Sequence, residues 1–436
     1  MGLSGLEVDS YRAFALPARL TLRPLTLVFG HNSRGKSALV RTLPLLAASA
    51  TRESGGPLNL RSPAAGGASF AEIKAQHHPS PTVGFQIEWS DDRAPVRRLK
   101  IRILGGGARS LEYVEQMEAF DASGASCLKL LLKDDVRSLY DIRGGERGVE
   151  PSPELVDVPV KFDGLLPSFL VPPERTALRA AQEGVRARLA ALHDEVHWLK
   201  GTRVLPERRP ELKGRPPPVS PTGASAAEHL AFSSLGDRSL IEEVSAFYRS
   251  ATDHELNVDP VSIGGAKEVA LTLSPLTGPP VRVNILDTGE GMAQVLPVLV
   301  LGAMAKLGEL GEAPVLVLEH PELHLHPRAH QEVARFLCAV AASRPDARIV
   351  VETHSENFLS EVQLCVLDEI LAADQVAVNW VWADEGGAAV QLLAMDDLAR
   401  IEAWPPQVFS EDSLLKREIL KRRRARMEQQ GMLGET

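Results

Sequence analysis

Two hydrophobic patterns divide the chain into regions. A mostly apolar run at 25–29 predicts a short buried strand, followed by a helix over 37–50. Alternating apolar and polar residues at 83–89 and 99–103 predict strands of an antiparallel meander. From Met292 onward, helices alternate with short apolar strands, predicted at 292–307 (helix), 314–318 (strand), 329–342 (helix) and 347–351 (strand). This alternation is typical of a parallel sheet.

The middle of the chain is predicted to be mostly helical. After the proline-bearing stretch 151–173, apolar residues recur at helical spacing and predict an amphipathic helix ending near Lys200; they are Leu178, Val185, Leu189, Leu192, Val196 and Leu199. We expect an irregular segment at 206–221, two helices between 224 and 251, and strands at 269–273 and 281–285. One helix of this length cannot form a long antiparallel coiled coil. The predicted domains are 1–173 (N-terminal ATPase lobe), 174–252 (helical insertion), 253–400 (C-terminal ATPase lobe) and 401–436 (basic tail).

Composition narrows the class of protein. With 436 residues, 44% of them hydrophobic, the chain can bury the cores of two or three domains. Its three cysteines are far apart, which favours a reducing compartment and argues against a disulfide framework or a zinc site. The start lacks a signal-peptide pattern and no apolar run is long enough to cross a bilayer, so we expect a cytoplasmic protein without a membrane partner.

The net charge of −9 argues against a wholly basic surface, although a local patch can still bind nucleic acid. The run from Lys416 to Arg426 is such a patch. As a helix, this run would present a cationic face that could bind either phosphate backbones or an acidic partner. The alternative is a solvated terminal helix without a binding role.

The candidate chemistry begins at the end of the first buried strand. Gly30 to Ser37 matches G-x-x-x-x-G-K-[ST], a phosphate-binding loop, in the required context of strand, loop and helix. The glycines allow backbone N–H groups to point at phosphate oxygens, the lysine supplies a positive charge, and the serine hydroxyl suits Mg²⁺. The predicted nucleotide-binding residues here are Gly30, Asn32, Ser33, Arg34, Gly35, Lys36, Ser37 and Ala38.

Two further strands end in polar residues. The run 315–318 ends at Glu319, which predicts a carboxylate at the ligand-facing edge of a parallel sheet. His320, Glu322, His324 and His326 follow, but two prolines interrupt the helical spacing that would gather them around zinc. The run 349–351 leads to His354, which could sense a terminal phosphate or simply belong to the cap of the next helix.

Taken together, these segments resemble those of ABC-class AAA ATPases related to OLD, RecF and SMC heads. Gly30–Ser37 resembles the Walker A motif, Leu318–Pro327 the Walker B motif with D-loop, and Glu352–Glu356 the switch-histidine motif. Leu286–Pro297 resembles the signature loop and its helix. Weaker matches at 201–209 and 403–409 resemble a compact bacterial subgroup with a short C-terminal domain of unknown function. The expected fold class is α/β, a P-loop NTPase of ABC head type with an antiparallel β meander and a helical insertion between Walker A and the signature loop.

The resemblance implies a head that binds ATP and Mg²⁺ and pairs with a second head, so that Gly289 and Gly291 contact the γ-phosphate in the other subunit. It implies Ser37 and Glu319 as metal-site residues and Gln76 as a weaker candidate, with a solvated loop amide as its other interpretation. The implied catalytic residues are Glu319, His320, Glu322 and His354. Family members usually carry a carboxylate where this chain has His320, so either His320 or Glu322 would have to serve as the base.

A second departure from the family pattern is Asp287, where the signature loop often has serine and where a negative charge would approach a triphosphate. The leading functional expectation is an ATPase coupled to a regulatory or DNA-directed process, which pairs through an ATP sandwich as a homodimer or a higher homo-oligomer. About eighty residues follow His354, too few for the TOPRIM nuclease domain of OLD proteins, so a separate effector protein is expected, as in bacterial antiphage systems. The alternatives are an ATP-gated module with little turnover and, less well matched, a small-molecule kinase.

Overall fold

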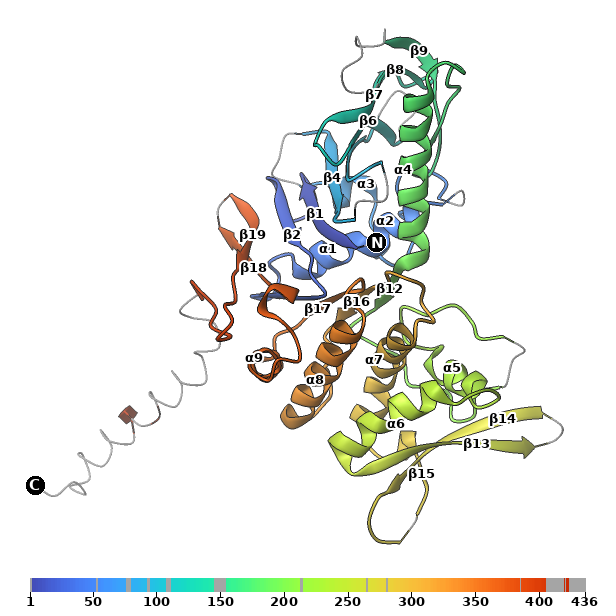
Figure 1. Cartoon of the computed structure of the whole chain (residues 1–436), viewed down its shortest axis with the longest axis vertical. Coiled ribbons are helices and arrows are strands. Elements are labelled where there is room, and N and C mark those ends of the chain that lie inside the picture. The colour runs from blue at the N-terminus through green and yellow to red at the C-terminus, as the bar shows by residue number, and fades with distance from the viewer. Residues whose placement is uncertain are drawn as a thin grey trace, which may run out of the picture.

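The protein is described from a computed structural model, in which two lobes extend from opposite sides of a central sheet (Figure 1). The meander lobe contains the antiparallel strands between residues 3 and 168, and the hairpin lobe contains the long hairpin at residues 254–275. The structure describes residues 2–51, 54–75, 80–91, 95–106, 111–144, 154–211, 215–263, 266–279, 281–384, 386–404, 419 and 421–422. Gln76 and most of the basic tail therefore lie outside the described residues.

The central sheet contains the strand that leads to the phosphate-binding loop. Its order is β12-β16-β17-β3-β18-β19, with β19 antiparallel to β18 and the other neighbours parallel. These strands are β12 (Val196–Leu199), β16 (Val315–Glu319), β17 (Arg348–Glu352), β3 (Leu25–Gly30), β18 (Val376–Asp384) and β19 (Gly387–Leu393). All residues of β3, β16 and β17 are buried, as expected for strands covered on both faces.

The second sheet is an antiparallel meander in the order β2-β1-β4-β5-β6-β7-β8-β9. Its strands are β1 (Leu3–Asp9), β2 (Ala18–Thr21), β4 (Thr82–Trp89), β5 (Arg98–Leu104), β6 (Tyr113–Phe120), β7 (Ser126–Asp134), β8 (Leu139–Arg143) and β9 (Leu155–Pro159). A short hairpin follows, made of β10 (Lys161–Asp163) and β11 (Leu166–Ser168). The β5 burial pattern alternates along most of the strand, which confirms that its apolar face covers a core.

The helices on the N-terminal side cover the meander core. They are α1 (Lys36–Val40), α2 (Thr42–Ser49), α3 (Phe70–Ile73) and α4 (Thr176–Glu195). The helix predicted over 37–50 is thus broken between α1 and α2. Helix α4 runs along the meander (Figure 1) and buries Leu178, Val185, Leu189 and Leu192 there.

The prediction that this helix continues to Lys200 is wrong. It ends at Glu195, and residues 196–199 form β12, which pairs in parallel with β16 at the edge of the central sheet. The backbone groups on the free side of β16 thereby gain hydrogen-bond partners, and these hydrogen bonds outweigh the helical spacing of Val196 and Leu199. A strand of the central sheet therefore lies inside the segment predicted as a helical insertion.

The C-terminal side carries the second hydrophobic core. Its elements are α5 (Ala226–Ser233), α6 (Ser239–Thr252), β13 (His254–Ile263), β14 (Ala266–Pro275), β15 (Val283–Asn284), α7 (Glu290–Leu307), α8 (Pro327–Ser343) and α9 (Glu356–Leu367). The strand predicted at 281–285 is reduced to β15, because Ile285–Asp287 forms a 3₁₀ turn. Helix α7 has the length and composition of a membrane span, but 72% of it is buried inside the protein.

The predicted fold class is confirmed. A mixed α/β core with a parallel sheet carries the phosphate-binding loop, and an antiparallel meander is joined to it. The sequence patterns did not reveal β1, β2, β18 and β19. Of these, β18 pairs directly with β3 and so completes the sheet beside the loop.

Candidate functional site

The phosphate-binding loop connects β3 to α1. Gly30 has a φ of 152°, and a Cβ there would lie 2.2 Å from the Val381 carbonyl oxygen. Gly35 has a φ of 99° and lies against Phe14. Both positions therefore require glycine for conformational and steric reasons. Asn32, Ser33 and Arg34 are exposed, so the outer side of the loop is open to a ligand.

Lys36 bends back over this loop. Its Nζ donates to the carbonyl oxygens of Gly30 and His31, each at 2.9 Å. Burial lowers the pKa of the ammonium group, and the nearby Glu352 carboxylate partly opposes that effect. The charge is therefore poorly solvated, which favours exchanging neutral carbonyl partners for anionic phosphate oxygens.

Glu319 lies at the end of β16, as predicted, and both of its carboxylate oxygens have partners. Arg41 donates to it through Nε and Nη2, each at 2.6 Å. Trp198 donates its indole N–H at 2.9 Å, and the Gly201 backbone N–H is 3.5 Å away. Arg41 follows α1 and Trp198 belongs to β12. Glu319 thus ties the phosphate-loop side of the sheet to its edge strand.

Glu352 ends the neighbouring strand, β17. Its Oε1 accepts a hydrogen bond from the Ser37 hydroxyl at 2.6 Å, while its Oε2 is buried without a hydrogen-bond partner among the described residues. The side chain is 2% exposed. Burial raises the pKa of this carboxyl, opposed by the Ser37 hydrogen bond and by nearby His320. Glu352 therefore contacts the P-loop serine directly, whereas the hydrogen bonds of Glu319 go to other residues.

Two predicted catalytic histidines lie beside Glu352. The rings of His320 and His354 stack with centroids 5.3 Å apart and planes 11° apart. His320 Nε2 is 3.8 Å from Glu352 Oε1. Loss of water around its buried side, together with the positive charge of Lys36, lowers the pKa of His354 to about 4. His354 is therefore neutral near neutral pH.

Glu322, the other predicted base, is fixed differently. Its Oε1 accepts from the Thr353 hydroxyl at 2.6 Å and from the His354 backbone N–H at 3.4 Å. Its Oε2 is buried without a hydrogen-bond partner among the described residues, and its Oε1 lies 4.0 Å from His320 Nδ1. Glu322 thus joins the loop after β16 to the turn after β17, within reach of His320.

Arg203 was named only in a weak motif match, yet it forms hydrogen bonds to the backbone on two sides of the site. Its buried guanidinium donates to the carbonyl oxygens of Gln294 at 2.9 Å, Glu319 at 3.2 Å and His320 at 3.2 Å. Burial lowers the pKa of Arg203 to about 10, which still leaves it protonated. One side chain therefore links the loop after β16 to α7, the helix that follows the predicted signature loop.

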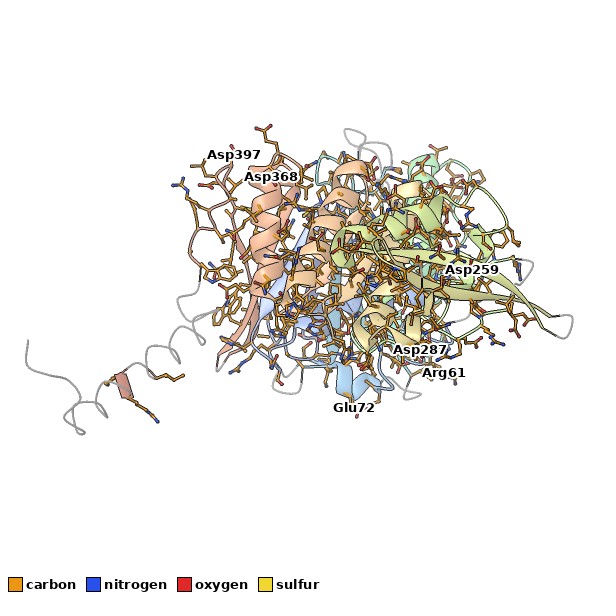
Figure 2. The ribbon with its side chains drawn as sticks, turned by 90° about the horizontal axis from the view of Figure 1, so that it is seen from below. Arg61, Glu72, Asp259, Asp287, Asp368 and Asp397 are labelled. Carbon is orange, nitrogen blue, oxygen red and sulfur yellow. The ribbon has the colours of Figure 1, made fainter. Side chains whose placement is uncertain are left out.

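The predicted signature loop lies on the surface. Gly289 is exposed with a φ of 120°, and a Cβ at Gly291 would lie 2.7 Å from the His324 carbonyl oxygen. Arg208 forms a two-pronged ion pair with Asp287, with N···O distances of 2.9 and 2.6 Å. Asp287 lies in the right half of the view in Figure 2, on the same side as Asp259 of β13. The negative charge that departs from the family pattern therefore has a fixed cationic partner.

The structure thus brings together Lys36, Ser37, His320, Glu322 and His354 around the loop, and it adds a residue that the sequence reasoning did not select. Glu352 follows an apolar strand just as Glu319 does, so the same signal was present. Arg41, Trp198 and Arg203 gave no comparable signal. Gln76 is outside the described residues.

Comparison with known proteins bears on the C-terminal part of this site. Residues 226–360 match a family model described as "AAA domain, putative AbiEii toxin, Type IV TA system". The matched segment contains Gly289, Glu319 and His354 but not the phosphate-binding loop. This match supports an AAA-type ATPase domain that includes residues 226–360. No curated protein matches the chain.

Solved structures similar to this chain include three SMC heads. One is the SMC head bound to the C-winged helix domain of ScpA, with 11% identity, a TM-score of 0.49 and coverage of 90% of this chain and 98% of that one. The SMC head from Thermotoga maritima has 10% identity and a TM-score of 0.44, and the match covers 91% of this chain and 100% of that one. The third is an SMC head domain with an extended coiled coil, bound to the C-terminal domain of ScpA and derived from Pyrococcus furiosus. It has 9% identity and a TM-score of 0.47, and the match covers 90% of this chain and 96% of that one.

Proposed function

We propose that this protein is a Mg²⁺-dependent ATPase of ABC type whose heads pair around ATP. The observation that carries the proposal is the buried Lys36 ammonium folded onto the loop carbonyls, next to a serine hydroxyl that is bonded to a carboxylate. Lys36 would exchange its carbonyl partners for phosphate oxygens, and the loop N–H groups with the start of α1 would hold the remaining phosphate charge.

The donors at the sheet edge fit a magnesium ion. Ser37 offers a hydroxyl, and carboxylates end β16 and β17, which are the oxygen ligands that Mg²⁺ prefers. When bound, Mg²⁺ would neutralise charge on the phosphates. His320 stands where a base is expected, with Glu322 and Glu352 within 4.0 Å to accept or orient its proton. The stacked, neutral His354 would donate a hydrogen bond without adding charge.

The experiment that tests the ATPase is phosphate release with Mg²⁺ and ATP. The wild-type protein should release phosphate, and Lys36→Ala should lose at least about 100-fold in rate, because the lysine stabilises charge on the transferred group. Lys161→Ala, in an exposed ion pair of the meander lobe, is the matched control and should keep the wild-type rate. Equal rates in Lys36→Ala and wild type would overturn the proposal.

A second candidate is an ATP-gated binding module with little turnover. The observation that favours it is His320, since an imidazole replaces the carboxylate that usually polarises the attacking water. In that case ATP would be bound and retained, and phosphate release would be absent in wild type as well.

The biological output is a further part of the proposal. The matched family is described as a putative toxin of a toxin–antitoxin system, and that description concerns the family. We propose that this protein acts with a separate effector in antiphage defence, with its ATP-driven pairing as the regulated step. Nucleic acid remains a candidate partner through the basic tail, which lies largely outside the described residues.

A further inference from the structure

The order of strands determines which carboxylate is nearest to the phosphate-binding loop. Strand β17 lies between β16 and β3, with Glu352 paired with Glu319 on one side and with Val28 on the other. Glu319 is therefore one strand further from β3 than Glu352 is. A parallel sheet places the ends of all its strands along one edge, and the end of the adjacent strand lies closest to the loop.

The hydrogen bonds distinguish the two carboxylates in the same way. Glu352 Oε1 accepts from the hydroxyl of Ser37, the residue predicted to bind Mg²⁺. Its Oε2 is buried and has no hydrogen-bond partner among the described residues. A buried carboxylate oxygen without a donor is costly, and a cation beside Ser37 would relieve that cost.

Glu319 lacks this freedom. Its two oxygens are occupied by the Arg41 fork and the Trp198 indole N–H, and the Arg41 guanidinium also lies over the Trp198 ring at 5.7 Å. To bind a metal ion, Glu319 would have to give up charge-assisted hydrogen bonds in a nearly buried setting, since it is 3% exposed.

We propose that Glu352, together with Ser37, supplies the protein oxygens for the divalent ion at the phosphate-binding loop, and that Glu319 is a positioning residue that fixes α1 through Arg41. This inference rests on the proposed nucleotide-binding function and deepens it. It assigns the metal-site carboxylate to the strand next to β3, and it assigns to the residue at the end of β16 a mechanical role between α1 and β12.

The test compares the affinity of a fluorescent, slowly hydrolysed ATP analogue in Mg²⁺ and in EDTA. Wild type should bind more tightly in Mg²⁺. In Glu352→Gln, the Mg²⁺-dependent increase in affinity should be at least about tenfold smaller, which is the size of effect seen when residues around a metal are changed. Its affinity in EDTA should stay the same. Glutamine keeps the shape and can still accept from Ser37, so the fold is retained. Glu312→Gln, on an exposed loop, is the matched control.

The Glu319→Gln variant is expected to give the opposite result. It should keep most of the Mg²⁺-dependent gain but lower the melting temperature, because the Arg41 charge loses its anionic partner. Electron paramagnetic resonance of Mn²⁺ with each variant and the analogue gives a direct second readout. The inference is overturned if Glu352→Gln keeps the metal-dependent gain, or if Glu319→Gln loses it equally while still folded by circular dichroism. If wild type binds no nucleotide in either condition, the proposed function itself fails.

Discussion

Burial changes the chemistry of single histidines in this protein. His354 faces Lys36 and His320, and its pKa is lowered to about 4 mainly because one side of the ring is shielded from water. A charged imidazolium there would also repel Lys36. His354 therefore suits a role as a neutral hydrogen-bond donor to phosphate, and we expect no change of its charge across the physiological range.

His197 in β12 carries a pH-dependent stability term. Burial lowers its pKa from 6.5 to about 4, and its Nε2 has no hydrogen-bond partner among the described residues. Because the folded pKa lies below the unfolded one, the unfolded chain binds more protons between these values. The contribution of His197 to the free energy of unfolding is therefore fully present above pH 6.5. It decreases as the pH falls toward 4, by at most about 3 kcal/mol.

We therefore expect His197→Gln to weaken the acid sensitivity of unfolding. Urea denaturation at pH 7 and pH 5 measures it: the variant should lose less stability between the two than wild type does. His324→Gln, at an exposed histidine, is the control and should keep the wild-type difference. An unchanged difference in His197→Gln would contradict this assignment.

Among the elements, the segment after β12 couples two parts of the site. Arg203 connects the carbonyls of Glu319 and His320, after β16, to the carbonyl of Gln294 in α7. Gln294 in turn donates its side-chain amide to the Arg203 carbonyl at 3.3 Å. The loop after β16 and helix α7 are thereby held in one arrangement.

Arg203→Ala should lower the free energy of unfolding by about 3 kcal/mol, because several carbonyl oxygens lose hydrogen bonds from a buried charged donor. Chemical denaturation measures the loss. The exposed neighbour Arg209→Ala should stay within about 0.5 kcal/mol of wild type. If the two variants were equally stable, Arg203 would not be the link between these elements.

For the whole molecule, the proposed ATP sandwich predicts a second copy at the loop before α7, which is exposed at Gly289. Gly289 is at the surface, and Asp287 is paired with Arg208, so the loop can approach a triphosphate without an uncompensated negative charge. An ATP sandwich would bury this surface in a second copy and so complete each nucleotide site with backbone N–H groups from the other head.

We expect the mass in solution to double from 47.2 kDa when Mg²⁺ and a slowly hydrolysed ATP analogue are added. Light scattering after size exclusion measures it. Gly289→Asp should remain monomeric yet still bind nucleotide, because the new carboxylate would face phosphate. Gly278→Asp is the matched control, since Gly278 also has positive φ and open space around its Cβ.

Purification of the tagged protein from its native host, followed by the same size-exclusion step, tests whether a separate effector protein is bound. A second chain that elutes with the tagged protein would support the separate effector, and a dimer without other chains would count against it. A wild type that stays monomeric with bound analogue would contradict the sandwich.

The sequence by itself placed the loop between a buried strand and a helix, as the structure has it, and predicted its chemistry. The roles predicted for Gly30, Gly35, Lys36 and Ser37 depend on local backbone geometry and on atoms within one turn, so an octapeptide is enough to predict them. It also placed Glu319 at a strand end, because an apolar run followed by a charge marks where burial stops. The helix predicted to reach Lys200 failed because pairing with β16, a contact between distant segments, decided the state of residues 196–199.

Only the tertiary structure decided which strand lies next to β3. Two strands end in glutamate, and nothing local distinguishes Glu319 from Glu352. The insertion of β17 between β16 and β3 brings Glu352 to Ser37, while Arg41 and Trp198 occupy Glu319. Strand order arises from hydrogen bonding and packing between segments more than 300 residues apart along the chain, such as Ser37 and Glu352 with a separation of 315, which local sequence patterns do not encode.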